Sequence, residues 1–364
     1  MKKLQSKLII DTPQGSRKFV GQGVGVPSTM TGELVFNTSM SGYQEILTDP
    51  SYMGQIVLMT HPHIGNTGVN VEDNESKKVW VNGFIAKSFS IENYSSWRAD
   101  DTLTNFINKD QSIPMMEYVD TRAITRCVRE HGACRAVLST EAHDDDYLLK
   151  LLYNSSGMQG KSLAYQACSS SIYKYCDGDR AKINVIDCGC KTNIPEILKH
   201  LGCEVTIVPI IAPTSDWVFN CDAILISNGP GDPASLHEAI EKLRGILGVK
   251  PITGICMGHQ LISLALGAQT YKLPFGHRGS NHPIKDHTTG KVTISSQNHG
   301  FCVERESLIS VGAVVTHTNL NDNTVAGFAH YDKKCAGVQY HPEAKPGPEE
   351  NYHIMEEFLT FAGV

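Results

Sequence analysis

The stretch from Pro251 to Ala268 is PITGICMGHQLISLALGA, a short apolar run followed by a glycine-flanked cysteine and a second apolar run. The first run has the length of a buried strand, and the second has the length of a helix. Cys256 stands at their junction, in Gly254-Ile-Cys-Met-Gly258. A strand, a sharp turn with small neighbours and a helix form the nucleophile elbow of many hydrolases. The stretch therefore predicts a reactive thiol at a strand end, and an ordinary buried cysteine is the alternative.

Strand-like and helix-like segments alternate before this stretch. KINVIDCG (182–189), EVTIVPI (204–210) and DAILISNGPGDP (222–233) are apolar and strand-like, whereas TNIPEILKHLG (192–202) and ASLHEAIEKLRGILG (234–248) have helical patterns. This alternation predicts a doubly wound, mainly parallel α/β sheet. Sites in such sheets lie at the carboxyl ends of the strands, so we expect the SNGPGDP turn and the cysteine turn at one edge. Shorter strands and a closing helix are expected after residue 270.

The chain divides near residue 180, after small and polar connecting segments. We predict an N-terminal mixed α/β domain over 1–153, a linker over 154–181 and the doubly wound domain over 182–364. One helix of the first domain is well marked, with Asp120 as its cap and Gly132 as its stop. Its arginines indicate a solvated face, or alternatively a surface that contacts a partner.

Composition excludes several classes of function. The chain has 364 residues and a formal net charge of -6, which favours neither a nucleic-acid partner nor an anionic membrane. No apolar run approaches the roughly 18 residues of a membrane span. The eleven cysteines include no C-x-x-C pair, so reduced thiols in a cytoplasmic protein are expected, without a metal site. SSGMQGKS (155–162) lacks the first glycine of a phosphate-binding loop and follows a helical pattern rather than a strand.

His341 is the candidate base for Cys256. It lies in VQYHPEA, where Pro342 favours extended backbone. Side chains two residues apart on an extended chain point the same way, so Glu343 is placed to orient the His341 ring. A Cys–His pair oriented by a third group is the usual form of an activated thiol. A surface His-Pro turn is the alternative, and His259 is interpreted as a packing or capping residue.

These motifs resemble two known groups of proteins. GICMGHQL and HPE are similar to the signatures of class I, triad-type glutamine amidotransferases, and LISNGPGDP (225–233) is similar to their oxyanion strand. Four further stretches resemble the small, glutamine-hydrolysing subunit of carbamoyl-phosphate synthase, namely 36–70, VDTRAITR (119–126), GSNHPIKD (279–286) and SQNHGF (296–301). The chain departs from the usual pattern at Met257, where leucine is commoner, and in DCGCK, which carries two unusual cysteines.

The resemblance implies a flavodoxin-like amidotransferase domain and a role for each matching residue. Cys256 would attack the carboxamide of L-glutamine, His341 would be its general base and acid, and Glu343 would orient the histidine. The remaining implied positions are the oxyanion donors Gly229 and Met257 and the glutamine contacts Ser51, Gly231, Gln260, Asn298, Gly300 and Phe301.

The resemblance also implies a partner. The small subunit would pass ammonia to a large synthetase subunit, which uses ATP, Mg²⁺ and bicarbonate to make carbamoyl phosphate for arginine or pyrimidine synthesis. No cofactor is then expected on this chain, and a higher oligomer of such heterodimers is compatible with it. Two alternatives remain open, a free-standing glutaminase or γ-glutamyl hydrolase and a non-catalytic regulatory subunit. The first would need only the second half of the chain.

Overall fold

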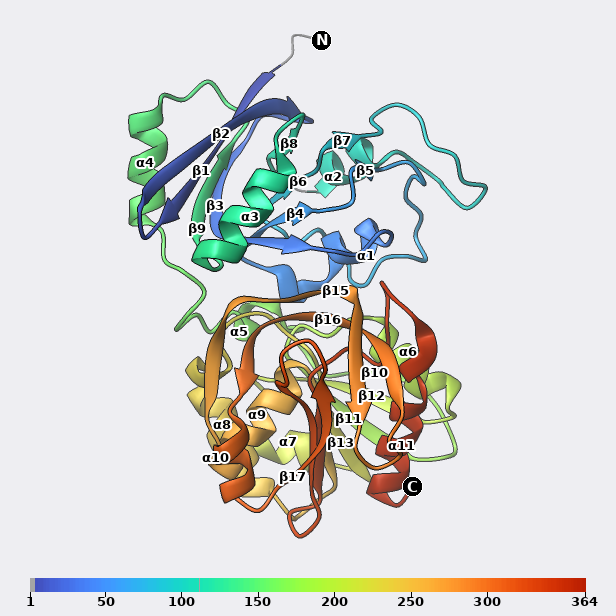
Figure 1. Ribbon diagram of the computed structural model, residues 1–364. Helices are drawn as coiled ribbons and strands as arrows, with labels where there is room; N and C mark the ends of the chain where they lie inside the picture. The colour runs from blue at the N-terminus through green and yellow to red at the C-terminus, as the bar shows by residue number, and fades with distance from the viewer. Residues whose placement is uncertain (1–3, 111) are drawn as a thin grey trace. The chain divides into compact units, whose positions relative to one another are not determined.

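The computed structural model describes residues 4–110 and 112–364. The chain forms two compact units (Figure 1). Unit 1 comprises residues 1–158 and 274–278, and unit 2 comprises residues 159–273 and 279–364. No helix within the described residues is long and apolar enough to cross a membrane.

Unit 1 is built on a closed barrel with mixed strand directions. The order around the barrel is β1-β2-β8-β6-β4-β3-β9, and β3, β4, β6 and β8 run parallel to their neighbours in that series. Closure leaves this sheet without an open edge. The strands are β1 (Leu4–Thr12), β2 (Gly15–Val24), β3 (Thr29–Asn37), β4 (Gln55–Met59), β6 (Gly83–Ile85), β8 (Met115–Glu117) and β9 (Arg135–Ser139), with β5 (His63–Ile64) and β7 (Ser88–Phe89) forming a separate pair.

Helices pack on the outside of this barrel. The predicted helix is present as α3, with the Asp120 side chain accepting from the Ala123 N–H and Gly132 at its end. Ile124 and Val128 bury the inner face of α3 against the barrel. The helical segments of unit 1 are α1 (Tyr43–Thr48), η1 (Pro50–Tyr52), α2 (Leu103–Asp110), α3 (Thr121–His131) and α4 (Asp145–Asn154).

Unit 2 contains the predicted doubly wound sheet. The strand order is β10-β12-β11-β13-β14-β19-β18-β17-β15-β16, and the five strands from β12 to β19 run parallel. The strands on either side are antiparallel. The strands are β10 (Tyr173–Cys176), β11 (Lys182–Asp187), β12 (Glu204–Pro209), β13 (Ala223–Ile226), β14 (Ile252–Ile255), β15 (Thr270–Asp286), β16 (Val292–Val303), β17 (Val314–Asn319), β18 (Val325–His330) and β19 (Cys335–Val338).

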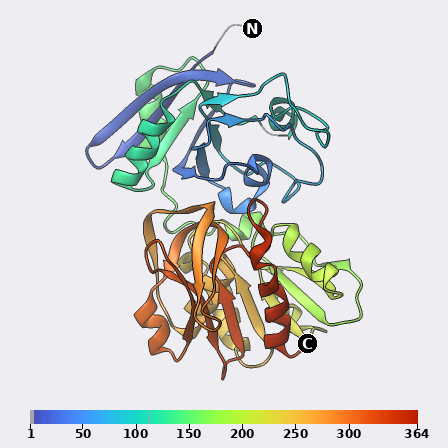
Figure 2. The ribbon, with the colours of Figure 1, turned by 45° about the vertical axis from the view of Figure 1, so that its right-hand side comes forward.

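Both faces of the central strands are covered by helices. One apolar core lies under α7, α8, α9 and α10, and a second lies under α6 and α11. Figure 2 shows α11 lying along its side of the sheet. The helical segments are α5 (Ala164–Ala167), α6 (Asn193–His200), α7 (Thr214–Val218), η2 (Pro233–Ser235), α8 (His237–Ile246), α9 (Met257–Leu266), α10 (Arg305–Ser310), η3 (Glu349–Asn351) and α11 (His353–Ala362).

Two segments differ from a simple strand, helix and linker pattern. The stretch 154–181, expected to be connecting chain, includes α5 and the edge strand β10, which pairs antiparallel with β12. Residues 274–278, in the middle of the long strand β15, belong to unit 1. There the Ala133 N–H donates to the Pro274 carbonyl at 2.7 Å, and the ring of Phe275 lies 5.9 Å from that of Phe36.

Candidate active site

Cys256 occupies a strained turn between β14 and α9. Its φ of 54° and ψ of -101° lie in a region that side-chain-bearing residues rarely adopt. Such strain costs on the order of 1–3 kcal/mol and persists only where the surroundings enforce it. The Cys256 N–H donates to the Val338 carbonyl at 2.9 Å, which ties the turn to the neighbouring strand β19. The thiol therefore sits at the carboxyl end of the parallel sheet, as the strand–turn–helix pattern predicts.

The two flanking glycines are required by close backbone approach. A Cβ on Gly258 would lie 2.2 Å from the Ile226 carbonyl oxygen. A Cβ on Gly254 would lie 2.5 Å from the Gly258 carbonyl carbon. Neither glycine has a positive φ, so the reason is space rather than conformation. This packing presses the start of α9 against β13 and β14 and fixes the direction of the turn.

His341 and Glu343 form a short, buried contact at the end of β19. The His341 Nδ1 lies 2.6 Å from a Glu343 carboxylate oxygen, and both side chains are almost fully buried. Burial alone would lower the pKa of His341, but the charges of Glu343 and Cys256 outweigh it and raise that pKa to about 10. The imidazolium form is therefore favoured next to Cys256. The backbone N–H of His341 donates to the Ser296 carbonyl at 2.9 Å, which fixes the main chain at this position.

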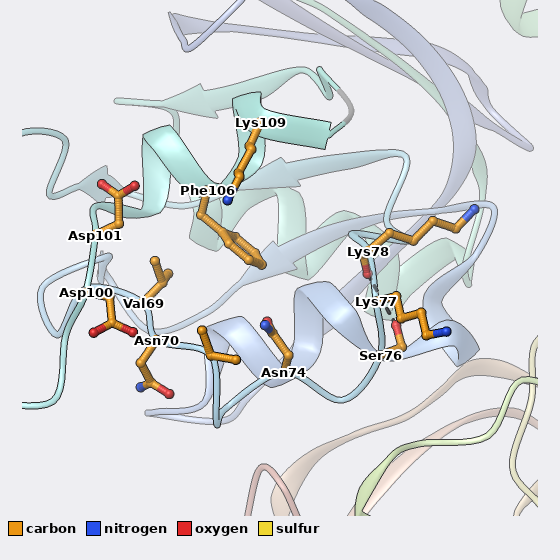
Figure 3. Close-up of a pocket in the computed structure, with 11 residues that line it drawn as sticks. Val69, Asn70, Asn74, Ser76, Lys77, Lys78, Asp100, Asp101, Phe106 and Lys109 are labelled. Carbon is orange, nitrogen blue, oxygen red and sulfur yellow. Dashed lines mark hydrogen bonds between the residues drawn. The ribbon is translucent and has the colours of Figure 1, made fainter. Parts of the chain in front are cut away.

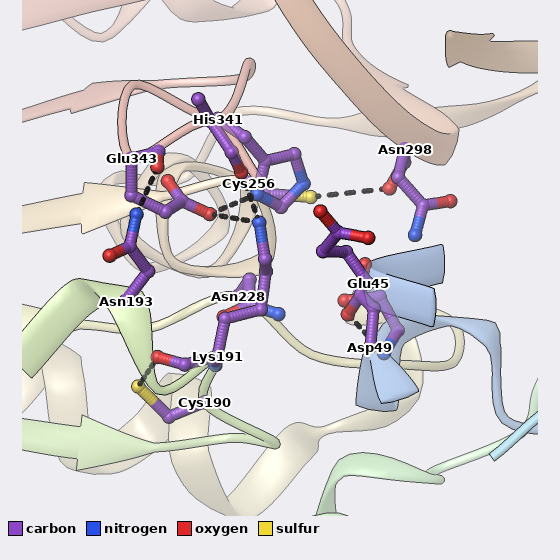
Figure 4. A network of polar contacts seen from close by, with 12 residues as sticks. Glu45, Asp49, Cys190, Lys191, Asn193, Asn228, Cys256, Asn298, His341 and Glu343 are labelled. Atoms are coloured by element: carbon purple, nitrogen blue, oxygen red, sulfur yellow. Dashed lines mark hydrogen bonds and ion pairs between the residues drawn. The ribbon is translucent and has the colours of Figure 1, made fainter. Parts of the chain in front are cut away.

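Lys191 completes this buried cluster, and the sequence analysis missed it (Figure 4). Its Nζ lies 3.1 Å from the same Glu343 oxygen that contacts His341, and it also donates to the Ala344 carbonyl. Burial raises the pKa of Glu343, but the cations Lys191 and His341 outweigh this and lower it to about 2. The Asn193 amide donates to the Glu343 carbonyl. Glu343 is thus held as a carboxylate between two cations.

The sequence around Lys191 explains how a lysine becomes buried. Asp187 ends β11, and its Oδ1 accepts from the N–H groups of Gly189 and Cys190, each at 2.8 Å. The Lys191 N–H donates to the Asn228 side chain at 3.0 Å. This tight loop directs the lysine inward at the carboxyl end of a parallel strand, where sites gather. Its position just after the strand was the signal that could have identified it.

Several predicted glutamine contacts surround Cys256 within unit 2. The Cys256 thiol donates to the Asn298 carbonyl at 3.6 Å. Gln260 is buried, and its amide donates to the Phe301 carbonyl at 2.7 Å and to Gln339 at 2.9 Å. Gly300 lies between Asn298 and Phe301 in β16. These positions therefore converge on one region, and their roles in binding stay predictions.

The other predicted positions lie on turns. Met257 is the first residue of α9, and Gly229 follows β13 with its α-carbon packed against the Cys188 carbonyl. Gly231 has a φ of 101°, a conformation that favours glycine. Ser51 is in unit 1, on η1, where its N–H donates to the Asp49 side chain at 2.8 Å. The contact of Ser51 with glutamine stays a prediction.

His259 lies three residues after Cys256 in the sequence. His259 is fully buried against Phe328, with ring centroids 5.1 Å apart, and burial lowers its pKa to about 4. This agrees with a packing role. Within residues 4–110 and 112–364, no three His, Cys, Asp or Glu side chains are grouped to hold a metal ion. Unit 1 contains a cavity of about 310 Å³ into which Phe106 and Lys109 of α2 project (Figure 3).

Comparison with known proteins follows the division into two halves. The family model "Carbamoyl-phosphate synthase small chain, CPSase domain" matches residues 14–138, and the model "Glutamine amidotransferase class-I" matches residues 184–361. A carbamoyl phosphate synthase small chain from Syntrophotalea carbinolica is 43% identical, over 94% of this chain and 94% of its own length. The small chain from Aquifex aeolicus is 44% identical over 94% and 96%. A small chain from Arabidopsis thaliana, described as chloroplastic, is 43% identical over 92% and 81%.

Proposed function

This chain belongs to the carbamoyl phosphate synthase small chain family. From this premise we propose that Cys256, His341 and Glu343 hydrolyse L-glutamine and that the ammonia passes to a large subunit. Family membership assigns the glutamine amidotransferase role to the chain. The observation that supports these residues is the buried 2.6 Å contact between His341 and Glu343 beside a cysteine in a strained elbow.

The proposed reaction has two halves. Cys256 attacks as the thiolate of a thiolate–imidazolium pair in which the cysteine proton already resides on His341, and a bond forms between the sulfur and the amide carbon of glutamine. The N–H groups of Gly229 and Met257 stabilise the resulting oxyanion, where one such donor contributes roughly 3 kcal/mol to the transition state. The C–N bond then breaks, and ammonia leaves with the proton from His341. A water that gives a proton to His341 attacks the γ-glutamyl thioester, the C–S bond breaks, and glutamate is released as the thiolate–imidazolium pair is restored.

Glu343 and Lys191 act on this reaction through His341. The carboxylate fixes the ring so that Nδ1 carries its proton toward Glu343 and Nε2 is left to exchange the proton with Cys256. Lys191 holds the carboxylate ionised and in place. Both are positioning residues, because neither reaches the reacting atoms.

The ammonia requires a receiving partner because protonation in bulk water would make it unreactive. We propose that the large subunit of carbamoyl phosphate synthase receives it and binds the ATP, Mg²⁺ and bicarbonate, so that no cofactor is needed on this chain. Unit 1 then serves as the docking platform, and the contact of Ser51 with glutamine stays a prediction. The arginine or pyrimidine role, any higher oligomer of the heterodimer and the cytoplasmic location stay predictions.

The test is a pair of cysteine variants assayed in the complex with the large subunit. Cys256→Ser should abolish glutamine-dependent carbamoyl phosphate synthesis and leave ammonia-dependent synthesis largely intact. Cys176→Ser, whose thiol donates to the Cys203 carbonyl, should leave both activities unchanged. Radiolabelled glutamine should form a thioester with the wild type and not with Cys256→Ser. Glutamine-dependent turnover by Cys256→Ser would show that another residue is the nucleophile.

A further inference from the structure

Helix α3 carries an arginine-lined groove that the glutamine chemistry does not use. The groove has a volume of about 360 Å³, and all of its lining belongs to unit 1. Its lining residues are Thr60, Thr121, Arg122, Thr125, Arg126 and Arg129. We call this set the arginine groove.

The spacing of the arginines places them on one side of the helix. At 100° per residue, Arg122, Arg126 and Arg129 fall within an arc of about 60°. All three side chains are exposed, whereas Ile124 and Val128 on the other side of α3 are buried. The helix is therefore fixed to the barrel by its apolar face and presents its arginines outward.

No described residue neutralises these arginines. Within residues 4–110 and 112–364, none of the three guanidinium groups makes an ion pair or a side-chain hydrogen bond. Two acidic residues lie nearby along the chain, and neither is within 4.0 Å of these guanidinium groups. Asp120 caps the helix through the Ala123 N–H, and Glu130 lies 3.9 Å from His131. These three positive charges therefore have no charged partner among the described residues, in a chain whose net charge is -6.

The chemistry of the groove selects its ligand. Guanidinium groups bind carboxylates with two parallel hydrogen bonds, and the threonine hydroxyls add further donors. Small-molecule pockets are lined mainly by apolar and aromatic side chains, and the arginine groove has none. The cavity in Figure 3 favours anions less than the arginine groove does, because the carboxylates of Asp100 and Asp101 also line it. One of its lysines, Lys78, lies over the Trp80 ring at 4.0 Å.

We propose that the arginine groove docks an acidic segment of the large subunit. The proposal rests on the proposed function, which requires that subunit, and it assigns to α3 the partner contact left open by the sequence. Arginine is enriched at protein interfaces, and complementary charge there speeds association and fixes register. The acidic partner segment is recognised by its carboxylates rather than by shape.

The experiment compares two charge reversals of equal size in the full-length chain. Arg126→Glu alters the groove, and Lys150→Glu alters an exposed lysine on α4 of the same unit. Binding to the purified large subunit is measured by biolayer interferometry at about 0.05 and 0.3 M salt, which changes the screening length roughly two- to threefold. Thioester formation with radiolabelled glutamine, measured on the isolated chain, reports on unit 2 independently.

We expect Arg126→Glu to raise the Kd about tenfold or more and to reduce its dependence on salt, since an interfacial charge pair is replaced by a repulsion. Lys150→Glu should stay within about twofold of the wild type. Arg129→Glu is a second groove variant, and it should behave like Arg126→Glu. Circular dichroism checks that each variant is folded.

Wild-type affinity in both groove variants would overturn the proposal while leaving the amidotransferase function intact. A groove variant that loses binding of inorganic phosphate, measured by calorimetry, but keeps its affinity for the large subunit would also overturn it, because the groove would then be a small-anion site. If the wild type itself bound no large subunit or formed no thioester, the proposed function would fail first.

Discussion

The residues that prepare Cys256 for chemistry form a buried row of alternating charge. Lys191, Glu343 and His341 are each at most 2% exposed, and one carboxylate oxygen contacts both cations. Removing such charges from water is costly, and only close pairing offsets the cost. The row is therefore sensitive to the loss of any member, and each member affects the protonation of its neighbour.

Removal of the Lys191 charge should destabilise the protein. Lys191→Met leaves Glu343 buried with one cation instead of two, and breaking a buried pair in this way costs about 3–5 kcal/mol. Urea denaturation should show this loss in the free energy of unfolding. Lys199→Met is the matched control on α6, because its pair with Glu196 is largely exposed and should contribute no more than about 1 kcal/mol. Similar losses in the two variants would mean that the buried row contributes little.

Loss of the Glu343 carboxylate should lower the pKa of His341. In the wild type the pKa of His341 is about 10, so its ring should stay protonated through neutral pH. In Glu343→Gln the main attraction is gone while burial remains, so the ring should be neutral at pH 7. NMR of histidine-labelled protein measures both states. His259 is an internal control, because burial keeps its pKa near 4 and its ring should stay neutral in both proteins. A His341 signal that titrates identically in both would contradict the assignment.

The same shifts set the pH range in which this pair stabilises the fold. The pKa of His341 is raised from 6.5 to about 10, so its contribution is complete below pH 6.5 and is lost as the pH rises through 10. The pKa of Glu343 is lowered from 4.5 to about 2, so its contribution is present above pH 4.5 and is lost as the pH falls through 2. The stability difference between the wild type and Glu343→Gln should therefore shrink steadily between pH 6.5 and 10, as measured by denaturation at each pH.

At the scale of residues, the sequence identifies groups that its local pattern places together. The extended His-Pro-Glu segment predicts that Glu343 lies beside His341, and the structure has this contact. Lys191 was missed because its partner is 152 positions away. Its position after β11 places it at the sheet edge where sites gather, but it does not show that the side chain points inward. Gln260, which the resemblance implies as a glutamine contact, is buried because α9 is covered on several sides.

At the scale of elements, the β14–α9 elbow depends on the absence of side chains at its two glycines. Gly258→Ala should be destabilising by about 1–3 kcal/mol or more, because a Cβ 2.2 Å from the Ile226 carbonyl forces the backbone apart. The displacement should also lower glutaminase activity, because it moves the turn that carries Cys256. Gly245→Ala on α8 is the control. Its Cβ would have nothing within 4 Å, and alanine is favoured over glycine in helices by roughly 0.5–1 kcal/mol.

Thermal denaturation of the two alanine variants distinguishes the steric clash expected at position 258 from the general effect of replacing glycine by alanine in a helix. We expect the melting temperature to fall for Gly258→Ala and to stay level or rise for Gly245→Ala. An equal decrease in the melting temperature of both variants would contradict this explanation, because it would show that the close contact of Gly258 with β13 is not what requires glycine there.

The parallel strands of unit 2 were easier to predict than its outer strands β10 and β15. The parallel strands are continuous apolar runs, because helices cover both faces, and each run ends in a turn signal. The strand β15 extends over 17 residues but contains proline, glycine and several charged residues, so it shows no period-two pattern. In the edge strand β10, the neighbouring residues Tyr173 and Lys174 are both exposed. Its sequence therefore also lacks a period-two pattern and resembles connecting chain.

At the scale of the whole molecule, a short piece of the second half of the sequence stabilises the unit formed by the first half. Residues 274–278 are too few to show any periodicity, so the sequence could not assign them to unit 1. Phe275 is half-buried and packs against the barrel core next to Phe36. The two units are therefore linked through β15 as well as through the chain at residues 158 and 159.

Phe275→Ala should consequently weaken unit 1 although the residue lies far from it in sequence. Loss of a half-buried ring should cost about 1–2 kcal/mol in the opening free energy of the barrel. Hydrogen exchange of the β9 amides should accelerate, whereas exchange of the β11 amides in unit 2 should change little. Phe219→Ala is the matched control, because that ring is 74% exposed and its loss should leave both sets of amides unchanged. If Phe275→Ala accelerated exchange in β11 more than in β9, the assignment of residues 274–278 to unit 1 would be contradicted. Phe275 would then support the parallel sheet of unit 2 instead of the barrel.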